Sequence, residues 1–197
     1  MADLKQEVFK SVLSAAANLG QGLYVQAYTC VARVYLSPRH KNILFGHQPA
    51  EQVTVIGPKG ELAVSVADAN ADQTRVELSY TEAARLGLKN LPIYDGTTRG
   101  GAPCILRGSE GKATLDHGVV APARTLCISA DYATAYGLTE NQRISAEIDS
   151  PDRSLILGNI LVSICDDDSL ALYLDIDEAS ASGLTEGQYV KLLTTSP

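Results

Sequence analysis

Apolar and polar residues alternate in short runs along most of the chain, which is the pattern of half-buried β-strands. Residues 23–37 predict a strand pair, and residues 53–66 predict a hairpin with the turn sequence GPKG. Residues 74–79 predict a further strand. Between residues 92 and 120, glycines separate apolar runs at hairpin spacing, so we expect more short strands there. The pattern as a whole predicts a mainly β protein.

One pattern occurs three times: an alanine stands four residues before a Gly-Leu pair, and a strand-like run follows. An alanine lets a short helix lie close to a sheet, and a glycine in the left-handed conformation ends such a helix. In the first copy, Ser79 and Glu82 have capping-box spacing, which supports a helix start there. We therefore predict three short helices, within residues 79–93, 129–144 and 177–190.

Residues 3–19 place their apolar side chains along one stripe at helical spacing, which predicts an amphipathic helix that ends near Gly20. Two interpretations are open. The stripe packs on the body of the protein, or it docks on a partner.

Short helices among hairpins are typical of small β-barrels with helical crossovers rather than of a parallel doubly wound sheet. We therefore predict a mainly β protein with short helices, made of two small β-barrel domains and an N-terminal amphipathic helix. The expected boundaries are approximate, and an exchange of strands between the barrels is an alternative. They are residues 1–22 for the helix, 23–100 for the first barrel and 101–197 for the second.

The net charge of -7 and the pI near 4.9 argue against a nucleic-acid binder, because such binding depends on Lys and Arg. No apolar run reaches the ~18 to 20 residues that a bilayer-spanning helix needs. The N-terminus also lacks the basic segment followed by an apolar segment that is typical of a secretory signal. We expect a cytoplasmic protein that binds neither nucleic acid nor membrane.

The four cysteines are widely spaced and form no CxxC motif. In a reducing compartment such residues are more often small buried apolar side chains than disulfide partners. We expect that of each of them, namely Cys30, Cys104, Cys127 and Cys165.

Three stretches carry weaker chemical signals. A polar connector expected at residues 37–49 holds His40 and His47, which lack the third and fourth ligand that zinc requires. The acidic run 166–168 lacks the alternating spacing of a calcium loop, so a solvated turn is the simpler interpretation. The loop at residues 96–101 either presents backbone N–H groups to an anion or is a plain hairpin connector. Its candidate binding residues are Arg99, Gly100 and Gly101.

Several motifs together resemble a known family. They are VYLS, VTVIGPKGEL, QTRVELSYTEAARLGL, DGTTRGGAP, HGVVAPAR with ISADYATAYGL, and LDIDEASASGL, in that order over most of residues 31–190. The chain resembles the PduL-type phosphotransacylases, bacterial-microcompartment enzymes that exchange acyl-CoA and acyl phosphate. This resemblance implies two β-barrel domains and a dinuclear zinc site served largely by histidines.

At the five positions where the resemblance implies zinc-binding histidines, this chain has other residues. They are Arg33, Tyr35, Thr125, Cys127 and Tyr173. The resemblance also implies a glutamate, kept as Glu77, an arginine six residues earlier, replaced by Ala71, and a second arginine, kept as Arg124. Neutral Tyr and Thr are poor metal ligands at pH 7, so we expect no metal and no other cofactor.

The missing ligands make a non-catalytic paralogue, a pseudoenzyme, the leading hypothesis. It would act as a binding, structural or regulatory component with a protein partner, either a microcompartment shell or an enzyme, or as a homo-oligomer. One alternative is an acyl-CoA/acyl-phosphate transferase or other enzyme with a rebuilt active site, in which Cys127 is the nucleophile and Glu77 the base. Another is binding of CoA or a nucleotide without turnover. The candidate cleft residues are Arg33, Tyr35, Glu77, Arg124, Cys127 and Tyr173.

Overall fold

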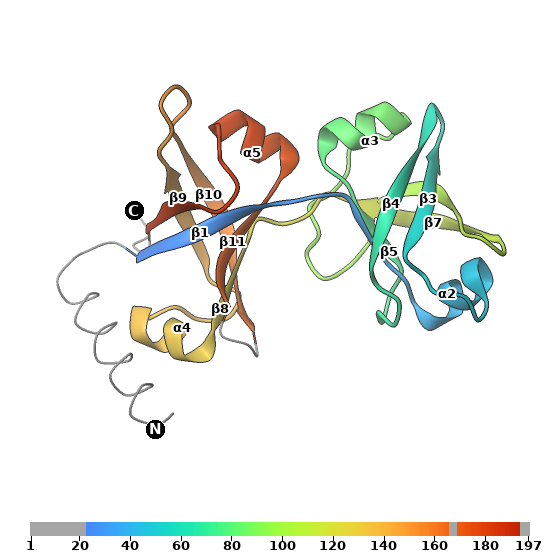
Figure 1. Ribbon diagram of the computed structural model, residues 1–197, viewed down its shortest axis with the longest axis horizontal. Helices are drawn as coiled ribbons and strands as arrows, with labels where there is room; N and C mark the ends of the chain where they lie inside the picture. Colours follow the sequence, from blue (N-terminus) through green and yellow to red (C-terminus); the bar gives the residue numbers. More distant parts are fainter. Residues whose placement is uncertain (1–22, 166–168, 194–197) are drawn as a thin grey trace. The chain divides into compact units, whose positions relative to one another are not determined.

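Figure 1 shows the computed structural model of the chain, which describes residues 23–165 and 169–193. The amphipathic helix predicted at residues 3–19 and the acidic run 166–168 lie outside the described residues. The described part folds into two closed barrels of six strands each, and each barrel includes two short helices. This architecture confirms the predicted fold class.

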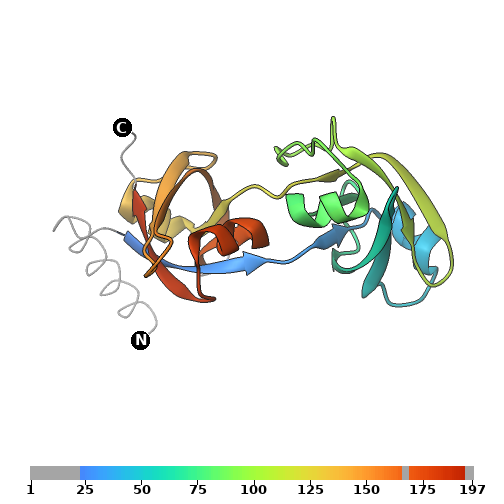
Figure 2. The same cartoon turned by 90° about the horizontal axis from the view of Figure 1, so that it is seen from above.

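The first barrel, called the central barrel here, comprises residues 31–123. Its strands are hydrogen-bonded in the closed order β2-β4-β3-β6-β7-β5. The strands are β2 (Arg33–Tyr35), β3 (Gln52–Gly57), β4 (Gly60–Asp68), β5 (Arg75–Glu77), β6 (Ala102–Arg107) and β7 (Lys112–Val120), and the helices α2 (Pro38–Phe45) and α3 (Tyr80–Leu86) lie against them (Figure 2).

The second barrel, called the terminal barrel here, combines residues 23–30 with residues 124–165 and 169–193. Its closed order is β1-β11-β8-β10-β9-β12, so the first strand pairs with the last two strands of the chain, as Figure 1 shows. The elements are β1 (Leu23–Cys30), β8 (Thr125–Ser129), α4 (Ala130–Tyr136), β9 (Arg143–Ile148), β10 (Leu155–Cys165), β11 (Leu170–Asp175), α5 (Ile176–Ser182) and β12 (Gln188–Leu193).

The division between the barrels differs from the boundary expected near residue 100. Strands β6 and β7 close the central barrel, which therefore ends at residue 123. Strand β1 was expected in the first barrel but belongs to the terminal barrel. There it pairs with β11 in parallel and with β12 in antiparallel orientation. The glycine-rich run at residues 96–101 is thus a loop between two elements of the central barrel and not a domain boundary. Glycines are common in turns whether or not a domain ends there.

Alternation along the strands builds the two cores. In β2 the middle residue, Val34, is fully buried while its neighbours are only partly so. In β8, Leu126 and Ile128 are fully buried, and the residues between and before them are not. Side chains of a strand point alternately to its two faces, so each barrel has an apolar inner face and an outer face of mixed character. The outer faces therefore carry the candidate chemistry.

The three repeated helices confirm the predicted pattern. α3, α4 and α5 end at glycines in the left-handed conformation, Gly87, Gly137 and Gly183. The leucine after each glycine donates its N–H to the alanine carbonyl five residues earlier at 2.9 Å, which satisfies an open helix carbonyl. The predicted capping box of Ser79 and Glu82 is present, and α5 has a second one formed by Asp175 and Glu178.

The polar connector expected at residues 37–49 is wrong in part, because residues 38–45 form the helix α2. Ser37 caps this helix through its side chain, and Pro38 stands in the first turn, where its missing N–H costs nothing. Leu44 and Phe45 are buried against the central core. The Ser-Pro pair was the overlooked signal.

Within the two described stretches, no helix is long and apolar enough to cross a membrane.

Candidate functional site

The six candidate residues fall into two groups, one on each barrel. Arg33, Tyr35 and Glu77 belong to the central barrel, and Arg124, Cys127 and Tyr173 belong to the terminal barrel. All but Arg124 and Glu77 alternate with buried core residues on their strands and are only partly buried. The two groups are described separately below.

Strands β2 and β5 bring the central group together. They pair in antiparallel register, with Arg33 opposite Glu77 and Tyr35 opposite Arg75. Arg33 Nε lies 3.1 Å from Glu77 Oε2, and Arg75 Nε lies 2.8 Å from Glu77 Oε1. Each carboxylate oxygen thus faces one guanidinium group. The Glu77 side chain is only 8% exposed, against 17% for Arg75 and 32% for Arg33, so the carboxylate is the buried centre of this arrangement.

Arg75 was not among the sequence candidates. Its guanidinium carbon lies 3.5 Å from the centre of the Tyr35 ring and 4.4 Å from the centre of the Tyr94 ring. Cation–π contact with two rings and an ion pair with Glu77 hold this side chain in one place. Its period-two spacing from Glu77 on a predicted strand was the signal that would have found it. We call these five residues, Arg33, Tyr35, Arg75, Glu77 and Tyr94, the β2–β5 cluster.

Tyr35 stays a neutral phenol at neutral pH. Burial raises its pKa above the ordinary value of 10.0, and the nearby Glu77 carboxylate raises it further, while the two arginines act in the opposite direction. A neutral hydroxyl can donate a hydrogen bond to an oxyanion, but it is a poor ligand for a metal ion.

Arg124 is held by the terminal barrel. Its Nε donates to Glu178 Oε1 at 2.5 Å, and its Nη1 donates to the carbonyl oxygen of Gly158 at 2.6 Å. Burial raises the pKa of Glu178; Asp175 also raises it, while the hydrogen bond from Arg124 lowers it. Glu178 also closes the capping box of α5, so one side chain fixes both the helix start and the arginine. The sequence analysis did not single out Glu178.

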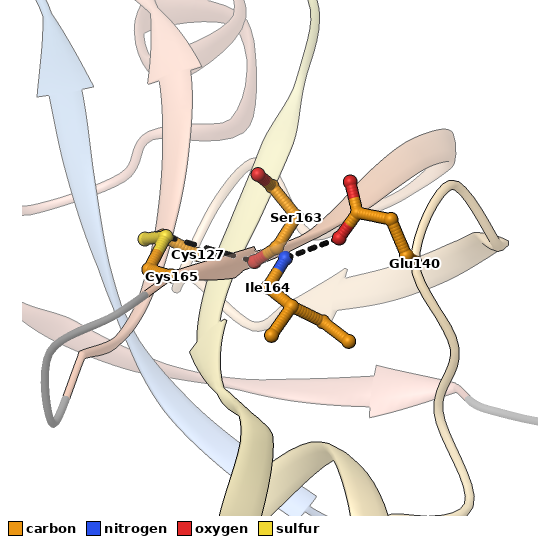
Figure 3. The surroundings of a disulfide bond; sticks show 5 residues. All are labelled: Cys127, Glu140, Ser163, Ile164 and Cys165. Atoms are coloured by element: carbon orange, nitrogen blue, oxygen red, sulfur yellow. Dashed lines mark hydrogen bonds between the residues drawn. A yellow bond between two sulfur atoms is a disulfide. The ribbon is translucent and has the colours of Figure 1, made fainter.

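Cys127 forms a disulfide with Cys165, which joins strands β8 and β10 (Figure 3). The two Cα atoms are 5.9 Å apart, within the usual range for disulfides, because the two strands pair in parallel at this point. Beside it, Ile164 N donates to Glu140 Oε2 at 2.6 Å (Figure 3). The expectation that these two cysteines are unpaired is therefore wrong: strand pairing brings together residues 38 apart, which no local sequence motif indicates.

The disulfide also decides the role suggested for Cys127. A bonded sulfur is not a thiolate, so in this state Cys127 is not a nucleophile. The two other cysteines form no disulfide: Cys104 is buried, as expected, with a pKa raised by burial to about 12, and Cys30 is half-buried.

Tyr173 lies on β11 opposite Thr125 of β8. Its ring centre is 6.2 Å from that of Tyr28 on the neighbouring strand β1, in a tilted aromatic contact. Tyr173 therefore contacts a side chain of the adjacent strand β1 on the outer face of the terminal barrel.

The weaker candidates have internal partners. His40 Nδ1 lies 2.8 Å from Thr74 Oγ1, and burial lowers the pKa of His40, with Arg39 acting in the same direction. In the loop at residues 96–101, Thr97 N, Arg99 N and Gly101 N each hydrogen-bond within the loop or to the adjacent Asp95.

Gly101 is required by packing. A Cβ atom there would lie 2.8 Å from Val119 O and 2.9 Å from Thr98 O. Gly100 has a positive φ of 78°, and Arg99 is exposed. The contacts of the loop thus agree with the connector interpretation, and the anion interpretation keeps only the Arg99 side chain.

A zinc pair does not fit the residues present. Over residues 23–165 and 169–193, no three His, Cys, Asp or Glu side chains come close enough together to hold a metal ion. The whole chain has only three histidines, all between residues 40 and 117. We therefore derive no chemical step through zinc.

Comparison with known proteins identifies the class. The family model described as phosphate propanoyltransferase matches residues 46–185. Curated relatives with the same name include one from Shewanella putrefaciens, 34% identical over 76% of this chain and 72% of the relative. Others come from Thermotoga maritima, 32% identical over 73% and 69%, and from Leptotrichia buccalis, 32% identical over 78% and 81%.

Two closed barrels and this match define a phosphate acyltransferase fold. The chain belongs to the phosphate propanoyltransferase family. The predicted resemblance is thereby confirmed. The pseudoenzyme hypothesis is wrong, because the relatives that match most of the chain are named as enzymes.

Proposed function

We propose that this chain is a phosphate acyltransferase, which exchanges an acyl group between CoA and inorganic phosphate. The observation that supports this proposal is the match of the family to residues 46–185, together with relatives named phosphate propanoyltransferase. A propanoyl group is the acyl group in those names. CoA as the other partner follows from the resemblance to phosphotransacylases.

The reaction makes two electrostatic demands. A phosphate oxygen attacks the thioester carbonyl carbon, a C–O bond forms, the C–S bond breaks, and CoA leaves as a thiolate that takes up a proton. Phosphate must be held, and the negative charge of the tetrahedral intermediate must be stabilised. Guanidinium groups serve both needs, since their fork of N–H donors matches phosphate oxygens.

The β2–β5 cluster is the proposed phosphate site of the central barrel. Arg33 and Arg75 supply positive charge, and Tyr35 supplies a hydroxyl that is neutral at pH 7. Glu77 is a positioning residue, because a buried carboxylate tied to both guanidinium groups fixes their orientation before the substrate binds. On the terminal barrel, Arg124 is a second candidate for an anionic group and is positioned by Glu178.

A direct assay tests this proposal. Purified protein is given propanoyl-CoA and inorganic phosphate, and the release of free CoA thiol and the formation of propanoyl phosphate are both measured. Arg75→Lys serves as the site variant and Arg107→Lys as the control, because Arg107 forms an exposed ion pair with Glu61 away from the cluster. We expect turnover in the wild type and the control, and a raised KM for phosphate in Arg75→Lys. No phosphate-dependent thiol release from a folded wild type contradicts the proposal.

Association with a protein shell or an enzyme partner in a bacterial microcompartment, inside the cytoplasm, remains part of the proposal. The apolar stripe of residues 3–19 supports it at the level of sequence. The chain with and without residues 1–22 is mixed with shell particles and sedimented. Equal sedimentation of both forms contradicts docking through this stripe.

A further inference from the structure

Four of the five side chains at the expected histidine positions connect neighbouring strands. In the central barrel, Arg33 of β2 pairs with Glu77 of β5, and Tyr35 of β2 stacks on Arg75 of β5. In the terminal barrel, Cys127 joins β8 to β10, and Tyr173 of β11 contacts Tyr28 of β1. The fifth, Thr125, pairs with Tyr173 in the strand register. At four of these positions, the side chain thus forms a contact between strands of its own barrel.

The donor atoms at these positions are poor zinc ligands. Zinc in catalytic sites is bound by about three protein ligands from His, Cys, Asp and Glu. Of the five side chains only Cys127 offers such an atom, and its sulfur is bonded to Cys165. Reduction of this bond would provide two thiols, which is still half of the four ligands of a tetrahedral site.

The charge of the β2–β5 cluster also disfavours a divalent cation. The one carboxylate, Glu77, already faces two guanidinium groups, so Arg33, Arg75 and Glu77 together carry a charge of +1. A zinc ion bound to the carboxylate would have to displace an arginine and would then lie beside two like charges in a half-buried place. An anion bound at the cluster would instead be attracted by this net positive charge and would displace no arginine from Glu77.

We infer that this chain binds no zinc pair, and that fixed guanidinium groups supply the positive charge of its acyl-transfer site instead. The inference rests on the proposed function for the reaction, but its test by zinc binding does not require turnover. Four of the five positions form contacts between strands, and the guanidinium groups of Arg33 and Arg75 each form an ion pair with Glu77.

Zinc stoichiometry is the decisive measurement. The full chain is purified without chelator from zinc-supplemented cells, and its metal content is measured by elemental mass spectrometry in oxidised and dithiothreitol-reduced form. The variant Thr125→His/Cys127→His serves as a positive comparison, because it places two imidazoles on the same outer face of β8. We expect no stoichiometric zinc in either form of the wild type, and tighter zinc binding in the variant. Stoichiometric zinc in the wild type overturns the inference.

A second measurement applies if the variant does not fold. The unfolding temperature of the wild type is recorded with EDTA and with added zinc, and we expect no shift between the two. Stabilisation by zinc at low excess indicates binding to the native state and overturns the inference. The assay of thiol release is run separately with EDTA. A protein that has no turnover and no zinc contradicts the proposed function alone, whereas zinc with turnover contradicts only the inference.

Discussion

The two barrels have the same plan but are fastened by different chemistry. Each closes six strands around an apolar core and ends its repeated helices at a left-handed glycine. On the outer face of the central barrel, one buried carboxylate and two guanidinium groups tie β2 to β5. On the terminal barrel, a disulfide ties β8 to β10. The comparison indicates that the apolar core determines the barrel fold. On the outer face, the same fold accommodates either an ion-pair cluster or a disulfide between neighbouring strands.

The two kinds of link respond to different conditions. An ion-pair cluster depends on its charges and weakens when one partner is removed, since a buried charge is then left alone. A disulfide is insensitive to salt and charge but is lost on reduction, and it stabilises mainly by restricting the unfolded chain. Perturbing each link separately should therefore affect one barrel and spare the other.

The largest expected effect follows from Glu77→Gln. The change keeps the side-chain volume but leaves two guanidinium groups without their carboxylate, and breaking a buried ion pair costs about 3–5 kcal/mol. Because Arg33 is 32% exposed, we expect the lower end of this range. Urea unfolding followed by hydrogen exchange of central-barrel peptides measures it.

The matched control is Glu61→Gln, which removes the carboxylate of an ion pair whose side chains are 54% and 40% exposed. Such surface pairs contribute about 0–1 kcal/mol. Equal losses in the two variants would mean that the β2–β5 cluster behaves as a solvated pair.

The next effect concerns the disulfide. Cys165→Ala opens a loop of 38 residues, for which the chain-entropy model gives about 4 kcal/mol as an upper value. We expect a loss of about 2–4 kcal/mol, seen as faster hydrogen exchange in β8 and β10 while the central barrel is unchanged. Dithiothreitol should weaken the wild type by the same amount and leave the variant unaffected. An unfolding free energy of the wild type that is the same with and without dithiothreitol contradicts the prediction.

The sequence predicted what depends on local pattern. Alternation at Val34, Leu126 and Ile128 gave the inner faces, and the spacing from alanine to Gly-Leu gave three helices with their caps. These signals are local, because one strand or one helical turn suffices to produce them. Arg33 and Glu77 were candidates because of the family resemblance, and in the structure Arg33 Nε lies 3.1 Å from Glu77 Oε2.

What the sequence did not predict depends on pairing between distant strands. The bond from Cys127 to Cys165 and the contact of Arg75 with Tyr94 require the register of a closed barrel. The same holds for the assignment of β1 to the terminal barrel, whose partners come more than a hundred residues later. Long-range pairing is fixed by the whole fold, so no short stretch indicates it.

A smaller effect is expected for Arg75→Lys. The ammonium keeps the charge but loses the planar stack on Tyr35 and Tyr94, and a cation–π contact contributes about 0.5–2 kcal/mol. Arg107→Lys, in the exposed pair with Glu61, should cost less. Urea unfolding of both variants tests this, and an equal cost would show that the two rings contribute nothing to holding Arg75.

The smallest effect is a pH dependence at Glu178 in the terminal barrel. Burial raises the pKa of this carboxyl above its ordinary value of 4.5, so the folded state binds the proton more tightly than the unfolded state. The contribution of Glu178 to stability is therefore complete below pH 4.5 and is lost as the pH rises through the raised pKa. Glu178→Gln has no carboxyl to titrate, so the stability of the wild type relative to this variant should decrease with rising pH. Urea midpoints of both proteins across this window test it. An increase instead would show that the ion pair with Arg124 outweighs burial, and that the terminal barrel holds its arginine as the central barrel does.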